Sequence, residues 1–312
     1  MSIKLGVVMD PISYKDGTFA ILLEASRRGW VIYYMEQKDL FLKDEVVSAT
    51  MRQLKIDDKK KKWSQFSNSM TQPLHQLDVV FMRKDPPFNM DYIYTTYLLE
   101  LAERRGVLVI NKPQSLRDAN EKLFTTWFPQ CMVPTLVTSN EELLLAFIHQ
   151  ERDIIVKPLD GMGGQSIFRI KVDDPNKTVI LEMMTRLGER YVMAQRYIPD
   201  VIKGDKRILM INGEPVPYAL ARIPQHDEIR ANLAAGGKGI GVKITERDRW
   251  ICKQVGSTLR KKGLIFVGLD VIGDYLTEIN VTSPTCIREI DAAFNINIGG
   301  QLLDFVEKIL NK

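Results

Sequence analysis

Short apolar runs alternate with amphipathic stretches over the first third of the chain, and this alternation restricts the fold more than any other feature. Apolar runs at 3–9 and 31–34 flank a helical pattern at 19–28. The same order returns at 78–82, 92–105 and 107–110. Strands that alternate with helices are typical of a parallel sheet with helices on its faces. Residues 1–118 are therefore predicted to form an α/β domain with a Rossmann-like parallel sheet.

The pattern changes from about residue 119, where β runs are separated by glycine and proline. Candidate strands lie at 153–156, 165–172, 191–197, 206–211, 217–223, 264–270 and 275–280. Candidate helices lie at 120–128, 141–150, 245–262 and 301–310. The pair Asn212-Gly213 between two of the strands is a strong signal for a hairpin turn. The second part of the chain is therefore predicted to be α+β, with mainly antiparallel sheets.

Composition and charge exclude several classes of protein. Of the 312 residues, 45% are hydrophobic and 26% are charged, a balance typical of folded domains and not of disordered chains. The net charge of +4 is too small to indicate nucleic acid, and we interpret the basic run at 59–62 as a solvated loop. The sequence shows three widely separated cysteines, no signal peptide and no apolar run of about 20 residues. We expect a cytoplasmic protein without a membrane or nucleic-acid partner.

A glycine-rich loop at 160–164 lies between two predicted strands and follows Lys157. Glycines let backbone N–H groups approach a polyphosphate closely, and the lysine adds countercharge. The loop is no dinucleotide fingerprint, because Ser166 holds the sixth position and a strand follows; the segment 236–239 is no P-loop either. The loop alone fits a nucleotide phosphate and a hairpin turn without ligand equally well. The small residues at 232–241 likewise fit either a lid or a surface loop.

Three oxygen-bearing side chains near the C-terminus form a candidate metal site. Glu278 and Asn280 share one face of a predicted strand, and Asp270 ends the strand before it. Such ligands suit Mg²⁺, although the wet face of a hairpin would show the same pattern. A regular two-residue turn would set Asp270 opposite Thr277, on the wrong face. We therefore predict a three-residue loop at 273–275, or an equivalent bulge, that sets Asp270 opposite Glu278.

Six ordered segments, spread over nearly the whole chain, carry a family resemblance. They are MRKDPPF (82–88), NKPQSLRDANEKL (111–123), KPLDGMGG (157–164), EPVPYALARIP (214–224), NLAAGGKG (232–239) and GLDVIGDYLTEINVTSPT (268–285). Together they resemble bacterial glutathione synthetases, which are ATP-grasp enzymes. The resemblance implies ATP-dependent ligation of γ-glutamylcysteine to glycine through an acyl phosphate, giving glutathione, ADP and phosphate. It also implies a substrate domain at 1–118, a central lid subdomain at 119–198, a catalytic subdomain at 199–312 and a homotetramer.

The resemblance also implies roles for residues at matching motif positions. ATP phosphates would be held by Lys122, Lys157, Asp160, Gly161, Gly163 and Gly164. The adenine and the ribose would contact Gln195, Arg196, Tyr197, Ile198 and Asp205. Two Mg²⁺ ions, with Mn²⁺ as an alternative, would bind Asp270, Glu278 and Asn280. The substrate would contact Arg83, Arg222 and Ser283, and catalysis would depend on Arg207, Arg222, Arg230 and Asn232.

Arginine suits the substrate carboxylates because its planar guanidinium binds a carboxylate through two hydrogen bonds. Without the resemblance, an arginine in a strand is more often an exposed ion-pair partner. In the lid, His226, Asp227, Ala231 and Ile240 depart from the family pattern, and fewer glycines predict a stiffer lid. Two other functions stay open: a different carboxylate–amine ligase on the same fold, and a nucleotide-binding scaffold without activity.

Overall fold

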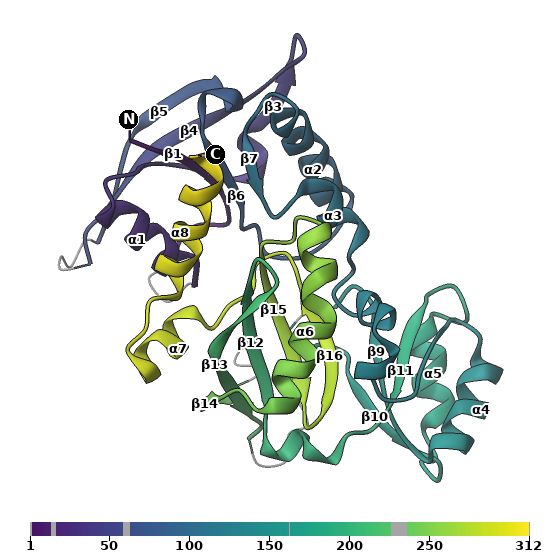
Figure 1. Cartoon of the computed structure of the whole chain (residues 1–312). Helices are drawn as coiled ribbons and strands as arrows, with labels where there is room; N and C mark the ends of the chain where they lie inside the picture. Colours follow the sequence, from purple (N-terminus) through teal and green to yellow (C-terminus); the bar gives the residue numbers. More distant parts are fainter. Residues whose placement is uncertain (1, 14–16, 59–62, 162, 226–235, 312) are drawn as a thin grey trace.

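The computed structural model describes residues 2–13, 17–58, 63–161, 163–225 and 236–311, and within them it shows three sheets with helices packed on them (Figure 1). The first sheet has a parallel core in the order β2-β1-β6-β7. Its strands are β1 (Lys4–Val8), β2 (Val31–Met35), β6 (Val79–Met82) and β7 (Leu108–Ile110). The connecting helices are α1 (Gly17–Arg27) and α2 (Met90–Glu103). The predicted parallel sheet is confirmed.

An antiparallel extension of this sheet has no counterpart among the predicted elements. It consists of β3 (Leu40–Lys43), β4 (Val46–Ile56) and β5 (Ser64–Pro73), and β4 joins it to β2. Residues 65–71 of β5 are exposed and mostly polar. A strand that buries neither face carries no hydrophobic alternation, so the sequence pattern could not reveal it. The first sheet is therefore mixed and not wholly parallel.

The second sheet forms a small unit with a core of its own. Its antiparallel order is β10-β9-β11-β8. The elements are β8 (Thr135–Thr138), α4 (Glu141–Glu151), β9 (Asp153–Pro158), β10 (Phe168–Lys171), α5 (Lys177–Thr185) and β11 (Val192–Arg196). Leu144 and Ile148 of α4 and Leu181 of α5 are fully buried against the sheet. The strand predicted at 165–172 is shorter than expected, because the backbone still turns at Ser166, where φ is +56°.

The third sheet has the antiparallel order β14-β13-β12-β15-β16. Its elements are β12 (Asp205–Ile211), β13 (Glu214–Ile223), β14 (Lys238–Lys243), α6 (Glu246–Lys261), β15 (Phe266–Ile272) and β16 (Tyr275–Asn280). Ile211 pairs with Glu214 across a two-residue turn in which Asn212 and Gly213 have φ of +48° and +76°. The hairpin predicted from Asn212-Gly213 is confirmed, as are the antiparallel sheets.

The segment between the first and second sheets contains short turns of helix where an amphipathic α-helix at 120–128 was expected. After α3 (Pro113–Asp118) come two 3₁₀ turns, Leu123–Trp127 and Pro129–Cys131. The side chain of Asn120 accepts hydrogen bonds from the backbone N–H groups of Lys122 and Leu123, at 3.0 and 2.9 Å. Thr125 donates to the Lys122 carbonyl. Such local side-chain bonds compete with the α-helical pattern, and the prediction of a regular helix is wrong.

The last two helices, α7 (Ile287–Phe294) and α8 (Ile298–Leu310), bring the C-terminus back to the first sheet (Figure 1). Helix α8 packs on α1, where the Trp30 indole donates to Glu307 at 3.3 Å. Arg28 donates to the Gly300 carbonyl at 3.0 Å. None of the helices in the described ranges has the length and apolar character needed to cross a membrane.

Asn111, at the end of β7, ties the first sheet to the third. Its side-chain nitrogen donates to the carbonyls of Phe266 and Val281, at 2.8 and 2.7 Å, and its oxygen accepts from the Phe266 N–H at 2.9 Å. The side chain is buried, and these three bonds give both of its polar atoms hydrogen-bond partners. Both strands that carry the candidate metal ligands are therefore anchored from the N-terminal side.

Candidate active site

A cleft between the second and third sheets contains most of the residues predicted to bind a nucleotide. It encloses about 890 Å³ of empty space, counted out to its mouth. The predicted residues that line it are Lys122, Lys157, Gly161, Gly163, Gly164, Gln195, Arg196, Tyr197, Ile198 and Asp205. Asp160 is not among them, since its carboxylate pairs with Arg190. Ile155, Ile167 and Ile272 add apolar surface to the walls.

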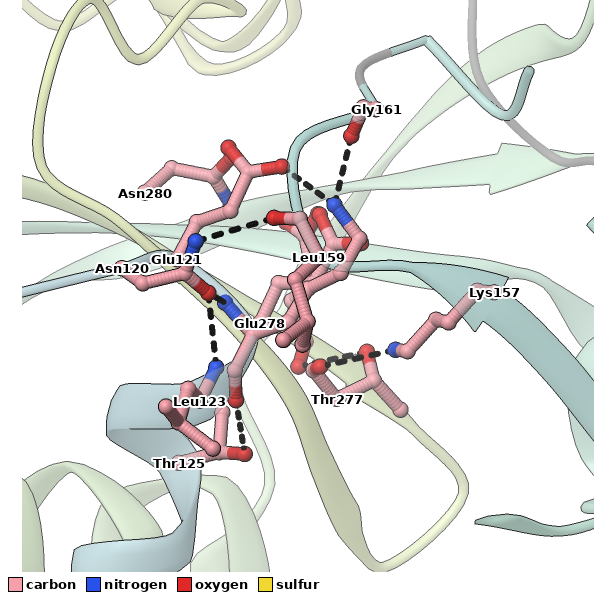
Figure 2. A network of polar contacts seen from close by, with 12 residues as sticks. Asn120, Glu121, Leu123, Thr125, Lys157, Leu159, Gly161, Thr277, Glu278 and Asn280 are labelled. Carbon is pink, nitrogen blue, oxygen red and sulfur yellow. Dashed lines mark hydrogen bonds and ion pairs between the residues drawn. The ribbon is translucent and has the colours of Figure 1, made fainter. Parts of the chain in front are cut away.

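Two lysines, Lys122 and Lys157, line this cleft, and Figure 2 shows Lys157 with its ammonium group directed at Thr277. The ammonium group of Lys122 donates to Glu121 and to the Gly161 carbonyl, and it lies 3.7 Å from Glu278. Although burial opposes it, these carboxylates raise the pKa of Lys122. Lys157 donates to the Thr277 carbonyl at 3.2 Å, and burial lowers its pKa. An anion in the cleft would therefore supply the countercharge that the buried Lys157 lacks.

Glycine is required at Gly161 because of a close approach. A Cβ there would lie 2.8 Å from the Pro158 ring. Gly163 and Gly164 have φ of +64° and +80°, which only glycine adopts without strain. The loop therefore presents its backbone directly to the cleft, as phosphate binding requires.

Residues 195–198, at and just after the end of β11, form another, partly apolar part of the cleft wall. The Gln195 amide donates to the Thr135 hydroxyl at 3.1 Å. The Arg169 guanidinium lies over the Tyr197 ring, 3.6 Å from its centre, and is held by two bonds to Asp153, at 2.9 and 2.6 Å. A flat, largely apolar nucleobase suits this part of the cleft wall.

Asp205 lines the cleft and has one carboxylate oxygen available to accept a hydrogen bond from a ligand. Its Oδ2 accepts from Arg222 at 2.5 Å, while Oδ1 is buried and has no hydrogen-bond partner among the described residues. Burial raises the pKa of Asp205 to about 7 despite the nearby guanidinium. A buried acceptor without a partner is costly, so a ligand hydroxyl donating to Oδ1 fits this position.

The three candidate metal ligands lie on one face, as predicted. The β15–β16 turn has two residues, since Ile272 pairs with Tyr275, but a bulge follows and sets Asp270 opposite Glu278. The prediction of a loop or bulge is confirmed in the form of the bulge. The Asn280 side chain donates to the Gly268 carbonyl at 3.4 Å, which leaves its oxygen for other partners. Two carboxylates and an amide oxygen are a donor set for a hard cation.

Asp270 is also the centre of a buried ion-pair network. Arg207 donates to both its oxygens, at 2.5 and 3.0 Å, and Arg222 to one of them at 2.8 Å. Burial alone would raise the pKa of Asp270, but the two guanidinium groups hold it well below its usual range. No group of three or more His, Cys, Asp or Glu side chains suited to a metal occurs in the described ranges. The amide of Asn280 is therefore needed to complete this candidate site.

A second cavity adjoins the cleft and shares Gly163 and Glu278 with it. It holds about 790 Å³ of empty space, counted out into the solvent at its mouth. Arg207, Arg222, Asn280 and Ser283 line it, together with Asp85, Glu121 and Cys286. Predicted catalytic and substrate residues thus meet here, next to the metal ligands. Asp85 and Glu121 were missed by the sequence analysis, although both lie within its motifs.

One further predicted residue, Arg83, lines neither cavity, and two others are not among the described residues. Arg83 is buried away from both cavities, and it donates to the Thr18 hydroxyl at 3.0 Å and to the Pro284 carbonyl at 2.9 Å. It lines a separate, small cavity behind the loop that carries Ser283. Arg230 and Asn232 lie outside the described residues, as do the basic run 59–62 and most of the expected lid.

Known protein families match this chain over nearly its whole length. The family described as prokaryotic glutathione synthetase, N-terminal domain, matches residues 3–117, and its ATP-grasp domain matches residues 121–295. A glutathione synthetase of Pseudomonas putida is 59% identical, over 99% of this chain and 99% of its own. That of Coxiella burnetii is 57% identical, over 98% and 97%, and that of Escherichia coli O127:H6 is 57% identical, over 99% of both chains.

Solved structures show the same fold at much lower identity. The D-cycloserine synthetase DcsG has a TM-score of 0.67 at 15% identity, covering 98% of this chain and 99% of its own. The ATP-grasp ligase PsnB, complexed with a minimal precursor, Mg and ADP, has a TM-score of 0.63 at 16% identity, covering 99% and 98%. These likenesses support the fold alone. The family matches over nearly the whole sequence show by themselves that the chain belongs to the prokaryotic glutathione synthetase family of ATP-dependent ligases with the ATP-grasp fold.

Proposed function

We propose that this protein joins γ-glutamylcysteine to glycine at the expense of ATP, giving glutathione, ADP and phosphate. One observation carries the proposal: a lysine-lined cleft and a guanidinium-lined cavity meet at Glu278, beside Asp270 and Asn280. The lysine-lined cleft fits a nucleoside triphosphate, and the guanidinium-lined cavity fits an anionic peptide. Their junction is where a phosphoryl group would pass from one to the other.

In the proposed reaction, the cysteinyl carboxylate attacks the γ-phosphorus of ATP and ADP leaves, forming an acyl phosphate. The amine of glycine then attacks the carbonyl carbon, and the C–O bond to phosphate breaks. Such transfers depend on positioning and charge neutralisation more than on a protein nucleophile. We assign Lys122, Lys157 and the loop of Gly161, Gly163 and Gly164 to the phosphates.

The cleft walls fit the rest of the nucleotide. The backbone and side chains at 195–198 would bind adenine, and the unpartnered Oδ1 of Asp205 would accept from a ribose hydroxyl. We propose that Asp270, Glu278 and Asn280 hold two Mg²⁺ ions, with Mn²⁺ as an alternative. A divalent cation held by these residues would supply positive charge to neutralise the charge that develops on the phosphates. The donor set of two carboxylates and one amide fits such a cation.

The arginines of the second cavity would hold the peptide. Arg207 and Arg222 line it and are fixed by Asp270, so their positions are set before substrate arrives. Ser283 adds a hydroxyl to the same wall. Arg230 and Asn232 stay assigned to catalysis on the family resemblance. Arg83, buried against Thr18 and Pro284, would act on the substrate indirectly, by holding the loop that carries Ser283.

We further propose a division into a substrate domain at 1–118, a lid subdomain at 119–198 and a catalytic subdomain at 199–312, and a cytoplasmic homotetramer. The separate core of the second sheet supports the lid subdomain. Strand β5 supports association of copies, because it is an edge strand of ten residues without a charged side chain. Unprotected edges of this kind pair readily with another strand.

The function is tested by ATP-dependent phosphate release with γ-glutamylcysteine and glycine supplied singly and together. Turnover that requires both substrates is expected, with glutathione identified by mass spectrometry. Turnover with another amine in place of glycine would indicate a different carboxylate–amine ligase. Nucleotide binding without turnover would indicate a scaffold and refute the proposal.

A further inference from the structure

The motif MRKDPPF contributes to the second cavity through Asp85 and not through Arg83. The guanidinium of Arg83 points to Thr18 and Pro284, behind the cavity wall. Asp85, two residues later, lines the cavity itself, and it faces the loop that carries Ser283. A carboxylate therefore stands in a cavity whose other charged groups include Arg207 and Arg222.

Contacts around Asp85 hold its carboxylate in place without neutralising it. The Ser283 hydroxyl donates to Oδ1 at 2.5 Å. The neighbouring Lys84 is directed elsewhere: its ammonium donates to Asp10 at 3.1 Å and to the carbonyl of Asp85 at 2.9 Å. The backbone N–H of Asp85 donates to Asp10 at 3.3 Å. Among the described residues, no cation pairs with the Asp85 carboxylate, so its charge is available to a ligand.

The cavity therefore combines anion-binding and cation-binding groups, which fits a zwitterionic ligand. γ-Glutamylcysteine carries two carboxylates and one α-ammonium group. We propose that Asp85, positioned by Ser283, binds the α-ammonium group of the γ-glutamyl residue and so selects γ-glutamyl donors. The inference rests on the proposed function, and it adds a recognition site for one group of that substrate.

The alternative ligand for Asp85 is the ammonium group of glycine. That amine must lose a proton before it can attack the acyl phosphate. A neighbouring carboxylate stabilises the charged ammonium form and raises its pKa, which would suppress the nucleophile. The α-ammonium of the donor takes no part in the reaction, and it can stay paired throughout. Asp85 therefore suits the donor and not the acceptor.

The test compares γ-glutamylcysteine with N-glutarylcysteine, which lacks only the α-amino group, in the wild type and in Asp85→Asn. Because a charged hydrogen bond is lost, we expect kcat/KM for γ-glutamylcysteine to fall about 10- to 100-fold in Asp85→Asn. We expect kcat/KM for N-glutarylcysteine to change less than about threefold, since it makes no such bond. Retained activity on that analogue also shows that the variant is folded.

A matched control is Asp118→Asn, which removes one carboxylate that lies outside both cavities, 3.9 Å from Lys262. It should leave the ratio of the two donor substrates unchanged. Ser283→Ala keeps the charge of Asp85 but removes its positioning bond, and it should lower the preference for γ-glutamylcysteine only partly.

Equal losses on both donors in Asp85→Asn would overturn the proposal, as would a rise confined to the KM of glycine. Direct titration of γ-glutamylcysteine into the enzyme with a non-hydrolysable ATP analogue gives a second reading. Binding to Asp85→Asn as tight as to the wild type would also overturn it. A wild-type enzyme that turns over neither donor would refute the proposed function instead.

Discussion

Asp270→Asn should lower both stability and activity, because its carboxylate joins two buried arginines. The side chain is 2% exposed and accepts hydrogen bonds of 2.5, 3.0 and 2.8 Å from Arg207 and Arg222. Neutralising it leaves two guanidinium groups facing each other without their shared anion. Breaking a buried pair in this way costs about 3–5 kcal/mol. Since Arg222 keeps Asp205 as a partner, we expect the lower end, about 3 kcal/mol.

Glu278→Gln is the matched comparison, because it neutralises the residue opposite Asp270 in the proposed metal site. Its carboxylate lies 3.7 Å from Lys122, which keeps Glu121 and the Gly161 carbonyl as partners. The stability loss should therefore stay below about 1 kcal/mol. Catalysis should fall by at least about 100-fold, since a proposed metal ligand is lost, while ADP affinity should change much less.

The assays are thermal unfolding without ligands and phosphate release with all substrates. For a chain of this length, about 2 °C accompanies each kcal/mol, so Asp270→Asn should melt about 6 °C below the wild type. Glu278→Gln should melt within about 2 °C of it. An Asp270→Asn variant with the wild-type melting temperature would refute the reasoning about the arginines. Full activity in Glu278→Gln would refute the metal assignment.

Three further changes test other parts of the structure. Lys157→Met should lower ADP affinity more than about tenfold, as measured by calorimetry. The same change should raise the free energy of unfolding by about 1 kcal/mol in urea, because a buried charge is removed. A lower free energy of unfolding would contradict this reasoning about the buried charge. Burial raises the pKa of Asp291 to about 6 from 3.8, so its stabilising contribution is full below about pH 4 and is lost as pH rises through 6. The stability of the wild type relative to Asp291→Asn should therefore fall between pH 4 and 7 in urea unfolding, and a constant difference would exclude it. Asn68→Lys combined with Met70→Lys places two charges on the β5 edge and should shift the sedimentation coefficient to smaller species; an unchanged coefficient would remove β5 from the proposed interface.

The fold could be predicted from the sequence wherever burial imposes a regular spacing. β1, β6 and β7 are short apolar runs because both faces of a parallel strand are covered, and the Asn212-Gly213 turn follows from backbone conformations that few residues adopt. β5 could not be predicted, because its exposed polar residues leave no spacing to detect. The 3₁₀ turns at 123–131 depend on hydrogen bonds from Asn120 and Thr125 that compete with an α-helix.

Some features of the candidate site could be predicted from the sequence, and others could not. The pairing of Asp270 with Glu278 could be predicted, because the two side chains share one face of the sheet only if a bulge or a longer loop shifts the register. The directions of Arg83 and Asp85 could not, since the chain leaves β6 at Met82 and its alternation of faces ends there. Which of the two enters the cavity is decided by Thr18 and Pro284, which lie 65 and 201 residues from Arg83 in the chain. Sequence spacing carries no information on contacts of that kind.

The return of α8 to the first domain has a consequence for how the protein forms during synthesis. Ile21 and Leu22 of α1 belong to the same buried cluster as Leu302 and Val306 of α8. The ribosome makes α1 long before α8, so this apolar surface of α1 stays uncovered until α8 has been made. Nascent chains should therefore need shielding by a chaperone until α8 has emerged, and loss of residues 301–310 should destabilise the first sheet more than the second.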